Sequence, residues 1–190
     1  AAIAYSADYM ATTMVKHSGI AGMLCQMFHT RFDPKAGSQD TRKKKIAAIE
    51  AKINEPLQTV PSLDEDLIVR RFVNLITSIN RTNFYQRTDD GGLPATMSFK
   101  INSRNITDLP EPRPFAEIFV YSPDVEGVHL RAGRIARGGL RWSDRPEDFR
   151  TEVLGLAKAQ NVKNAVIVPV GSKGGFVPKK LPVGGSREEV

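Results

Sequence analysis

Residues 134–175 read RIARGGLRWSDRPEDFRTEVLGLAKAQNVKNAVIVPVGSKGG, and this stretch decides the fold. Pro146 suits the first turn of a helix, and apolar residues then recur at helical spacing as far as Gln160. The run AVIVPV at residues 165–170 is continuous and rich in β-branched side chains, which is typical of a buried strand. It leads into the glycines of residues 171–175, which we interpret as a loop. A helix followed by a strand with a glycine loop at its end predicts an α/β domain whose ligand lies at the carboxyl ends of the strands.

The N-terminal part of the chain has helical patterns. Apolar residues repeat at helical spacing around residues 20–28 and over residues 39–54. A further helix is expected after Ser62, because Ser62 and Glu65 form a capping box in front of an apolar stripe. We therefore predict a helical region over residues 1–92.

The pattern changes after residue 92, where short segments acquire strand character. These segments, separated by turns that contain proline or glycine, are residues 95–101, 115–121 and 127–132. Together with the helix and strand described above, they predict an α/β region over residues 93–190. The order of strand, helix and strand leads us to expect a mixed, mostly parallel sheet.

The composition is that of an ordinary globular protein of 190 residues. No apolar run approaches the roughly 20 residues that a membrane span requires. Cys25 is the only cysteine, which excludes an intrachain disulfide and fits a reducing cytoplasm. The three histidines are widely spaced, so no metal-ligand cluster is predicted.

Positive charge is concentrated in one part of the chain. Residues 131–180 contain eleven Lys and Arg against four Asp and Glu, whereas the whole chain has a formal net charge of +6. An excess of cations in a glycine-rich region with apolar flanks favours a site for a small anion. Some arginines of this region are expected to pair with neighbouring acids instead. These are Arg141, Arg145 and Arg150, with Asp144, Asp148 and Glu152 as the acids.

Common phosphate-binding and nucleic-acid-binding patterns are missing from the sequence. Lys173 is followed by Gly174 rather than by Ser or Thr, so the Walker A pattern is absent. The dinucleotide fingerprint G-x-G-x-x-G is absent as well. The basic segment has neither a series of stacking aromatic residues nor a recognition-helix pattern, so we expect no nucleic-acid partner. A non-enzymatic module that binds anions or nucleic acid stays open as an alternative function.

Three motifs in a fixed order resemble the substrate-binding core of glutamate dehydrogenases. They are RGGLR at residues 137–141, QNVKNA at residues 160–165 and PVGSKGG at residues 169–175. The longer string they span is similar to the large-subunit, NAD-dependent bacterial branch of the Glu/Leu/Phe/Val dehydrogenase superfamily. The match covers roughly residues 115–190. The helical part before it is consistent with a region upstream of the catalytic domain in that branch.

The resemblance implies oxidative deamination of L-glutamate to 2-oxoglutarate and ammonium, with NAD as hydride acceptor. It implies that Lys173 is the catalytic lysine, and that Lys163 with Gln160 holds the α-carboxylate. Arg137 stands where smaller family members have a lysine that holds the distal carboxylate, so arginine is a departure from the pattern. The glycines implied at the substrate site are Gly138, Gly139, Gly171 and Gly174. No metal is implied.

The same resemblance implies that other parts of the enzyme lie outside this sequence. Neither the Rossmann domain that binds NAD nor the family's proton-transfer aspartate finds a match before Val190. The chain begins in an apolar pattern without an initiator methionine, so we expect a fragment that has no dehydrogenase activity alone. The intact enzyme is expected to be a cytoplasmic homo-oligomer without a membrane partner. A related dehydrogenase for an apolar amino acid is the alternative, since it shares the lysine motif but needs an apolar pocket in place of the distal cation.

Overall fold

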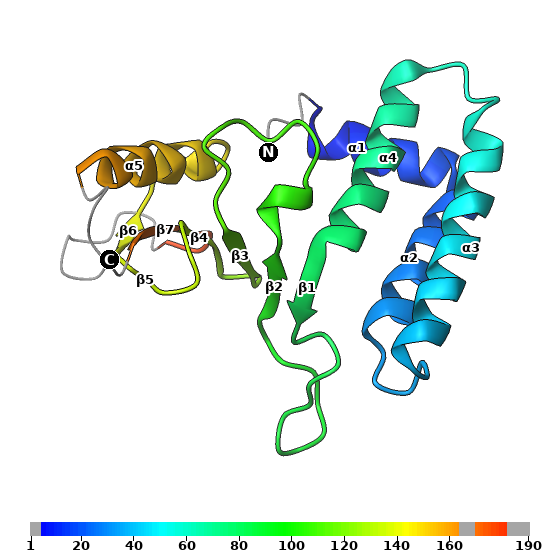
Figure 1. Ribbon diagram of the computed structural model, residues 1–190, viewed down its shortest axis with the longest axis horizontal. Helices are drawn as coiled ribbons and strands as arrows, with labels where there is room; N and C mark the ends of the chain where they lie inside the picture. Colours follow the sequence, from blue (N-terminus) through cyan, green and yellow to red (C-terminus); the bar gives the residue numbers. More distant parts are fainter. Residues whose placement is uncertain (1–4, 164–169, 182–190) are drawn as a thin grey trace. The chain divides into compact units, whose positions relative to one another are not determined.

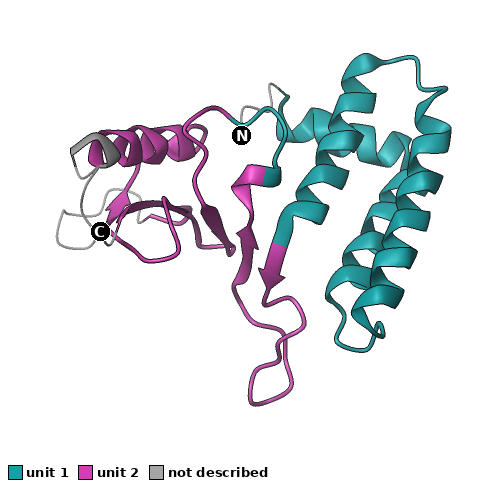
Figure 2. Ribbon diagram, in the orientation of Figure 1, with its two compact units in different colours: residues 1–79, 105–109 teal, residues 80–104, 110–190 magenta. Residues whose placement is uncertain are grey.

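The computed structural model describes residues 5–163 and 170–181 of the chain. The chain forms two compact units, coloured separately in Figure 2. One unit comprises residues 1–79 and 105–109, and the other comprises residues 80–104 and 110–190. The first unit is helical, and the second is a sheet with a covering helix.

The helical unit consists of α1 (Ala7–Lys16), α2 (Ser18–Phe32), α3 (Gln39–Leu57) and α4 (Leu63–Ser78), drawn in blue to green in Figure 1. Serine hydroxyls accept hydrogen bonds from backbone N–H groups in the first turns of α1, α3 and α4, which defines where these helices begin. Met27, Ile53 and Val69 are completely buried in the core of this unit. The helices predicted at residues 20–28, at residues 39–54 and after the capping serine are confirmed.

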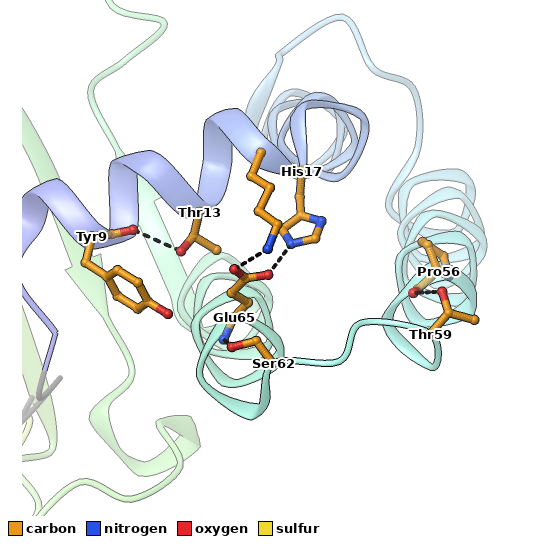
Figure 3. Close-up of polar contacts among 8 residues, drawn as sticks. Tyr9, Thr13, His17, Pro56, Thr59, Ser62 and Glu65 are labelled. Atoms are coloured by element: carbon orange, nitrogen blue, oxygen red, sulfur yellow. Dashed lines mark hydrogen bonds and ion pairs between the residues drawn. The ribbon is translucent and has the colours of Figure 1, made fainter.

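Glu65 connects the first turn of α4 to the corner between α1 and α2 (Figure 3). One carboxylate oxygen accepts a hydrogen bond of 2.6 Å from Nζ of Lys16, and the other lies 2.7 Å from Nε2 of His17. Only 10% of the Glu65 side chain is exposed. The hydroxyl of Ser62 accepts the Glu65 N–H at 3.4 Å, but the Glu65 carboxylate is engaged by Lys16 and His17. The structure therefore shows only the serine half of the predicted capping box among the described residues.

Replacing Glu65 with glutamine is expected to lower thermal stability at neutral pH and to reduce its loss in acid. Hydrogen bonds from Lys16, and then from His17, hold the pKa of the Glu65 carboxyl below its ordinary value. The stabilisation is therefore complete above the pKa of an unfolded glutamate, about 4.3, and is lost as the pH falls through the lower folded value. Unfolding temperatures of the wild type and of Glu65→Gln, measured between pH 7 and pH 3, test this.

Asp66→Asn provides a matched control, because Asp66 also lies in the first turn of α4 but pairs with Arg70 at the surface. Both substitutions remove one negative charge near the same helix N-terminus, so their effects on the helix dipole are similar. The surface pair contributes little. Equal effects of the two substitutions at every pH would contradict a special role for Glu65.

The second unit contains strands and one long helix. The strands are β1 (Ile79–Thr82), β2 (Met97–Ile101), β3 (Ala116–Tyr121), β4 (Val125–Arg131), β5 (Ala136–Arg137), β6 (Leu140–Trp142) and β7 (Val170–Pro178). The long helix is α5 (Phe149–Lys163), and a short 3-10 turn (Ser103–Asn105) follows β2. In the described residues the strands form one sheet in the order β1-β2-β3-β4-β7-β5, with β6 also beside β7. The helix predicted at residues 146–160 is thus confirmed, displaced by three residues toward the C-terminus.

The strand directions correct one prediction. The pairs β2–β3, β3–β4 and β4–β7 are antiparallel, and only β5 and β6 run parallel to β7. The described sheet is mixed, as predicted, but the prediction that it is mostly parallel was wrong. The reason is the connection between β3 and β4, in which the N–H of Ser122 bonds the carbonyl of Val125 at 2.8 Å. A turn this tight can only return the chain antiparallel, whereas α5 is long enough to make a parallel crossover.

One face of the sheet is covered by α5, as Figure 1 shows. The buried residues between them are Val128, Leu130, Phe149, Val153, Leu154 and Val177. Burying side chains of this size stabilises the packing by about 1.5–3 kcal/mol each. The core of the second unit therefore fixes α5 directly against β4 and β7.

The structure differs from the prediction for residues 165–175 where it describes them. The strand predicted at residues 165–170 lies outside the described residues except for Val170, which is the first residue of β7. The glycine loop predicted at residues 171–175 was wrong, because these residues are the interior of β7, where residues 172–175 pair with β4 and Gly171 pairs with Arg137 of β5. The glycines are therefore part of the sheet.

Candidate functional site

Two glycine-containing segments that are distant in sequence lie side by side in the sheet. β5 pairs with β7 through Arg137 and Gly171, and β6 pairs with β7 through Leu140 and Gly174. The two pairs have the same register, so Gly138 and Gly139, which lie between Arg137 and Leu140, are aligned with Ser172 and Lys173 of β7. The N–H of Gly174 bonds the carbonyl of Gly139 at 3.1 Å. Two of the three predicted substrate-binding motifs are thereby brought together.

Glycine is required here because neighbouring atoms approach too closely for a side chain. A Cβ at Gly138 would overlap the carbonyl oxygen of Ser172, and a Cβ at Gly171 would lie 2.9 Å from Cδ of Gln160. This explains why a loop was wrongly predicted at residues 171–175. The sequence shows that these positions need glycine, but the need arises from close packing within the sheet and against a helix rather than from a turn.

The glycines that follow Lys173 are constrained on opposite faces of the sheet. A Cβ at Gly174 would overlap the side chain of Leu140, whereas a Cβ at Gly175 would lie 2.5 Å from Cγ2 of Val153 on α5. Gly175 therefore determines how closely α5 can approach β7. This role was not predicted from the sequence, although the doubled glycine is itself a signal of close approach.

Lys173 lies on the face of the sheet that α5 covers. Strand residues alternate between faces, and Gly171 and Gly175, two positions away on either side, are the glycines that face α5. Lys173 is half-buried between them. Arg137 is exposed and is paired with Gly171, so it belongs to the same face. The predicted catalytic lysine and the predicted distal anchor therefore share one side of adjacent strands.

The side chain of Gln160 places a hydrogen-bond acceptor close to Gly171. Its Oε1 is buried and has no hydrogen-bond partner among the described residues. A buried polar atom without a partner costs about 1–3 kcal/mol, and a ligand that supplies a donor removes that cost. Lys163 is the last residue of α5, about one turn further on, and its side chain lies outside the part that the structure describes.

The cations of this region differ in whether they have acidic partners. Three arginines pair with acids, as predicted: Arg141 with Glu152 at 3.0 Å, Arg145 with Asp148, and Arg150 Nε with Glu117 at 2.9 Å. The partner of Arg150 lies on β3, which the sequence did not indicate. In contrast, within residues 5–163 and 170–181 neither Arg137 nor Lys173 has a carboxylate partner. Two cations on one face, beside an unsatisfied amide, can bind a small anionic ligand that also carries a hydrogen-bond donor.

Other classes of site find less support in the part of the chain that the structure describes. No group of three or more His, Cys, Asp and Glu there could hold a metal ion. No described helix is both long and apolar enough to span a bilayer. A dinucleotide pyrophosphate requires a glycine turn between a strand and a helix N-terminus, but the residues between β6 and α5 contain no glycine and those of 171–175 lie inside β7. Neither of these two described segments is therefore such a turn.

Comparison with known proteins identifies relatives over the whole chain. A family model described as the catalytic domain of bacterial NAD-glutamate dehydrogenase matches residues 52–190, and one described as glutamate dehydrogenase helical motif 3 matches residues 1–34. The chain is 54% identical over 190 residues to the NAD-specific glutamate dehydrogenase of Pseudomonas aeruginosa, covering 99% of this chain and 12% of that protein. The protein of the same name from Halomonas elongata is 53% identical over 185 residues, covering 96% of this chain and 11% of the relative. For that of Mycobacterium tuberculosis the identity is 48% over 181 residues, covering 94% and 11%.

Proposed function

The chain belongs to the bacterial NAD-glutamate dehydrogenase family, and on this premise we propose that it forms part of the substrate-binding region of such an enzyme. The reaction is oxidative deamination of L-glutamate to 2-oxoglutarate and ammonium, with NAD as hydride acceptor. The chain spans about 12% of the length of the relatives it matches, which supports its being one part of a longer protein. In this proposal the NAD site is formed by residues outside the chain, and residues 1–190 alone are inactive.

The observation that carries the proposal is that Arg137 and Lys173, which have no carboxylate partner among the described residues, lie beside a buried Oε1 of Gln160 that likewise finds no hydrogen-bond partner there. Glutamate is a dicarboxylate with an ammonium group, so its distal carboxylate suits the cation of Arg137, its reacting carbon can lie beside Lys173, and its ammonium supplies a donor for a buried acceptor. Neutralising such charges individually is what allows a dicarboxylate to leave water for a partly buried site. Ligands with a single negative charge satisfy only part of this arrangement.

Each residue has a defined role in the proposal. Arg137 binds the distal carboxylate, and its forked guanidinium can make two parallel hydrogen bonds to it. Gln160 and Lys163 bind the α-carboxylate end from the last turns of α5. The substrate-site glycines allow β5, β6 and β7 to pack closely, so that the substrate-binding side chains lie near one another. They are Gly138, Gly139, Gly171 and Gly174.

Lys173 is the catalytic residue in this proposal. Its ammonium hydrogen-bonds the oxygen of the substrate carbonyl, or of the water that adds to the oxidised carbon, and so stabilises negative charge that develops there. Its position on β7, within a strand paired on both sides, restricts the backbone from which the side chain extends. Pre-positioning of this kind lowers the entropic cost of reaching the reactive geometry.

Replacing Arg137 with methionine in the full-length enzyme tests the specificity directly. The kcat/KM for glutamate is expected to fall by about 10- to 100-fold, because one charge-assisted contact to the distal carboxylate is lost. Leucine has no distal carboxylate, so its kcat/KM should not fall and can rise. Steady-state kinetics with the two amino acids gives the ratio of kcat/KM for glutamate to kcat/KM for leucine, which is expected to fall in the variant.

The control is Arg145→Met, which removes a surface arginine already paired with Asp148. Its kinetics with glutamate should match those of the wild type. An equal loss for glutamate and leucine in Arg137→Met would contradict the assigned role. A wild-type preference for leucine would favour the alternative, a dehydrogenase for an apolar amino acid.

A further inference from the structure

A second cationic pocket lies on the other face of the same sheet. It is lined by Lys100 of β2, Arg131 of β4 and Arg134 from the segment after β4, with Phe115 and Ala116 as its apolar part. None of the described residues that line it is acidic. Three cations thus converge on one concave surface.

The strand register assigns this pocket to the face that α5 does not cover. Arg131 pairs with Ser172, which alternates with the α5-facing Lys173 and belongs to the same face as Gly174. Lys100 pairs with Ile118, whose partner on β4 is His129, two positions before Arg131. The pocket and the candidate substrate site are therefore separated by the thickness of the sheet.

The guanidinium of Arg131 is incompletely satisfied. One nitrogen, Nη2, donates to the carbonyl oxygen of Arg134 at 2.9 Å, but Nε is buried and has no hydrogen-bond partner among the described residues. Burying the donor of a charged group without a partner is costly, and an anion that accepts this hydrogen bond removes the cost. The geometry therefore leaves one side of the guanidinium fork for a ligand.

The acids that flank Phe115 and Ala116 in the sequence have other partners. Glu111 lies 3.1 Å from Arg113, and Glu117 bonds Nε of Arg150 at 2.9 Å on the α5 face. In the part of the chain that the structure describes, no carboxylate pairs with the three cations of the pocket. The field there is consequently positive. Burial first, and then the charge of Arg131, lower the pKa of neighbouring His129, which agrees with a positive local field.

We propose that Lys100, Arg131 and Arg134 form a second anion-binding site, which takes a small oxyanion such as a carboxylate or phosphate group. The planar fork of Arg131 suits two oxygens of one ligand, while Lys100 and Arg134 add charge without fixing its orientation. Phe115 limits the pocket on its apolar side, and its ring is already contacted by Arg104 at 5.5 Å from the ring centroid. This favours a compact anion over a large apolar molecule.

The site also has a direct connection to the catalytic face. Arg131 bonds the carbonyl of Arg134, and the same segment continues into β5, where Arg137 is located. The segment is held to β7 by two further backbone bonds, from Ala132 to Gly171 at 3.1 Å and from Val170 to Ile135 at 3.2 Å. An anion that immobilises Arg131 and Arg134 therefore immobilises the segment leading into Arg137.

Titration calorimetry on the full-length protein tests the site with inorganic phosphate and, separately, with acetate. The variant is Lys100→Gln with Arg134→Gln, which leaves Arg131 and its bond to the backbone in place. We expect at least about 10-fold weaker binding of the preferred anion, because charge-assisted contacts are lost. The KM for glutamate without added anion should stay within about 2-fold of the wild type. The tighter-binding probe identifies the ligand as phosphate-like or carboxylate-like.

Two matched variants make the result decisive. Arg145→Gln removes a surface arginine from the same unit and should leave anion binding unchanged, so equal weakening there would show a general charge effect and overturn the proposal. Arg137→Met should retain binding of the preferred anion. Loss of that binding in Arg137→Met, with retention in the Lys100 and Arg134 variant, would place the anion in the candidate substrate site instead. Absence of detectable binding in the wild type at anion concentrations up to about 10⁻² M also overturns it.

The proposal does not depend on the proposed dehydrogenase function. Anion binding is measured without turnover, and the glutamate-to-leucine ratio of Arg137→Met is measured without added anion. One can therefore fail while the other holds. If the Lys100 and Arg134 variant does not fold, Arg134→Gln alone serves, because Arg134 is exposed and its side chain has no hydrogen-bond partner among the described residues.

Discussion

Replacing Lys173 with alanine in the full-length enzyme is expected to lower kcat for glutamate by about 10²- to 10⁴-fold. This is the usual range for removal of a group that transfers or stabilises a proton at the reacting centre. The lysine lies on the α5 face of β7, between two glycines, so alanine leaves an open space and does not disturb the strand. Binding of glutamate should weaken less than turnover, because the predicted carboxylate anchors remain.

Steady-state kinetics, with an added primary amine as a second measurement, separates chemistry from folding. A small alkylamine can occupy the space left by the side chain, and partial recovery of turnover would support a chemical role. Lys180→Ala is the control, since Lys180 is an exposed residue paired with Asp124 at the surface. Near-normal turnover by Lys173→Ala would eliminate the catalytic assignment.

Replacing Gly138 with alanine is expected to separate β5 from β7 locally, at a cost of about 3 kcal/mol or more. The new Cβ would overlap the backbone carbonyl of Ser172, and a backbone atom cannot move aside as a flexible side chain can. Hydrogen exchange of the Gly174 amide reports this opening, because its N–H bonds the carbonyl of Gly139. Exchange should become about 100-fold faster, which corresponds to roughly 3 kcal/mol.

The neighbouring Gly139 supplies a control that differs by one position. A Cβ there meets no atom within 4 Å, and Gly139 is not among the described glycines with positive φ, Gly37 and Gly91. Gly139→Ala should therefore change the exchange rate by less than about 3-fold, as expected for an uncrowded position. If Gly138→Ala and Gly139→Ala accelerate exchange equally, the close approach of Ser172 to Gly138 does not explain the separation of the strands.

Local patterns were sufficient to predict α2, α3, α4 and α5 and three of the described strands, β2, β3 and β4. The apolar stripe of α5 and the serine cap of α4 are determined by residues within one or two turns, so the sequence carries that information directly. The pairing of Arg145 with Asp148 is of the same kind, because residues three apart on one turn are neighbours.

Long-range features could not be predicted in the same way. The antiparallel pairing of β4 with β7 and the contact of Arg150 with Glu117 join residues more than thirty positions apart, and no local pattern encodes them. The strand conformation of residues 171–175 was missed for a related reason. Glycine is required both by turns and by close packing, and only the positions of neighbours such as Gln160 and Val153 distinguish the two.

For the candidate site, the sequence supplied the residues but not their environment. The resemblance selected Arg137, Gln160 and Lys173. The structure adds that two of them share a sheet face and that the third has a buried acceptor with no partner in the described part of the chain. No sequence motif indicated the pocket around Arg131, because its residues come from different strands and a connecting segment.

The position of β7 also affects how the chain is made on the ribosome. β7 is the last described strand in sequence, yet it lies between β4 and β5 in the sheet. While residues 132–178 are being synthesised, which takes roughly 2–9 seconds, one backbone edge of β4 has no partner. Unpaired edges are templates for other chains. Nascent chains of this protein are therefore most exposed to mispairing with one another just before their central strand is complete.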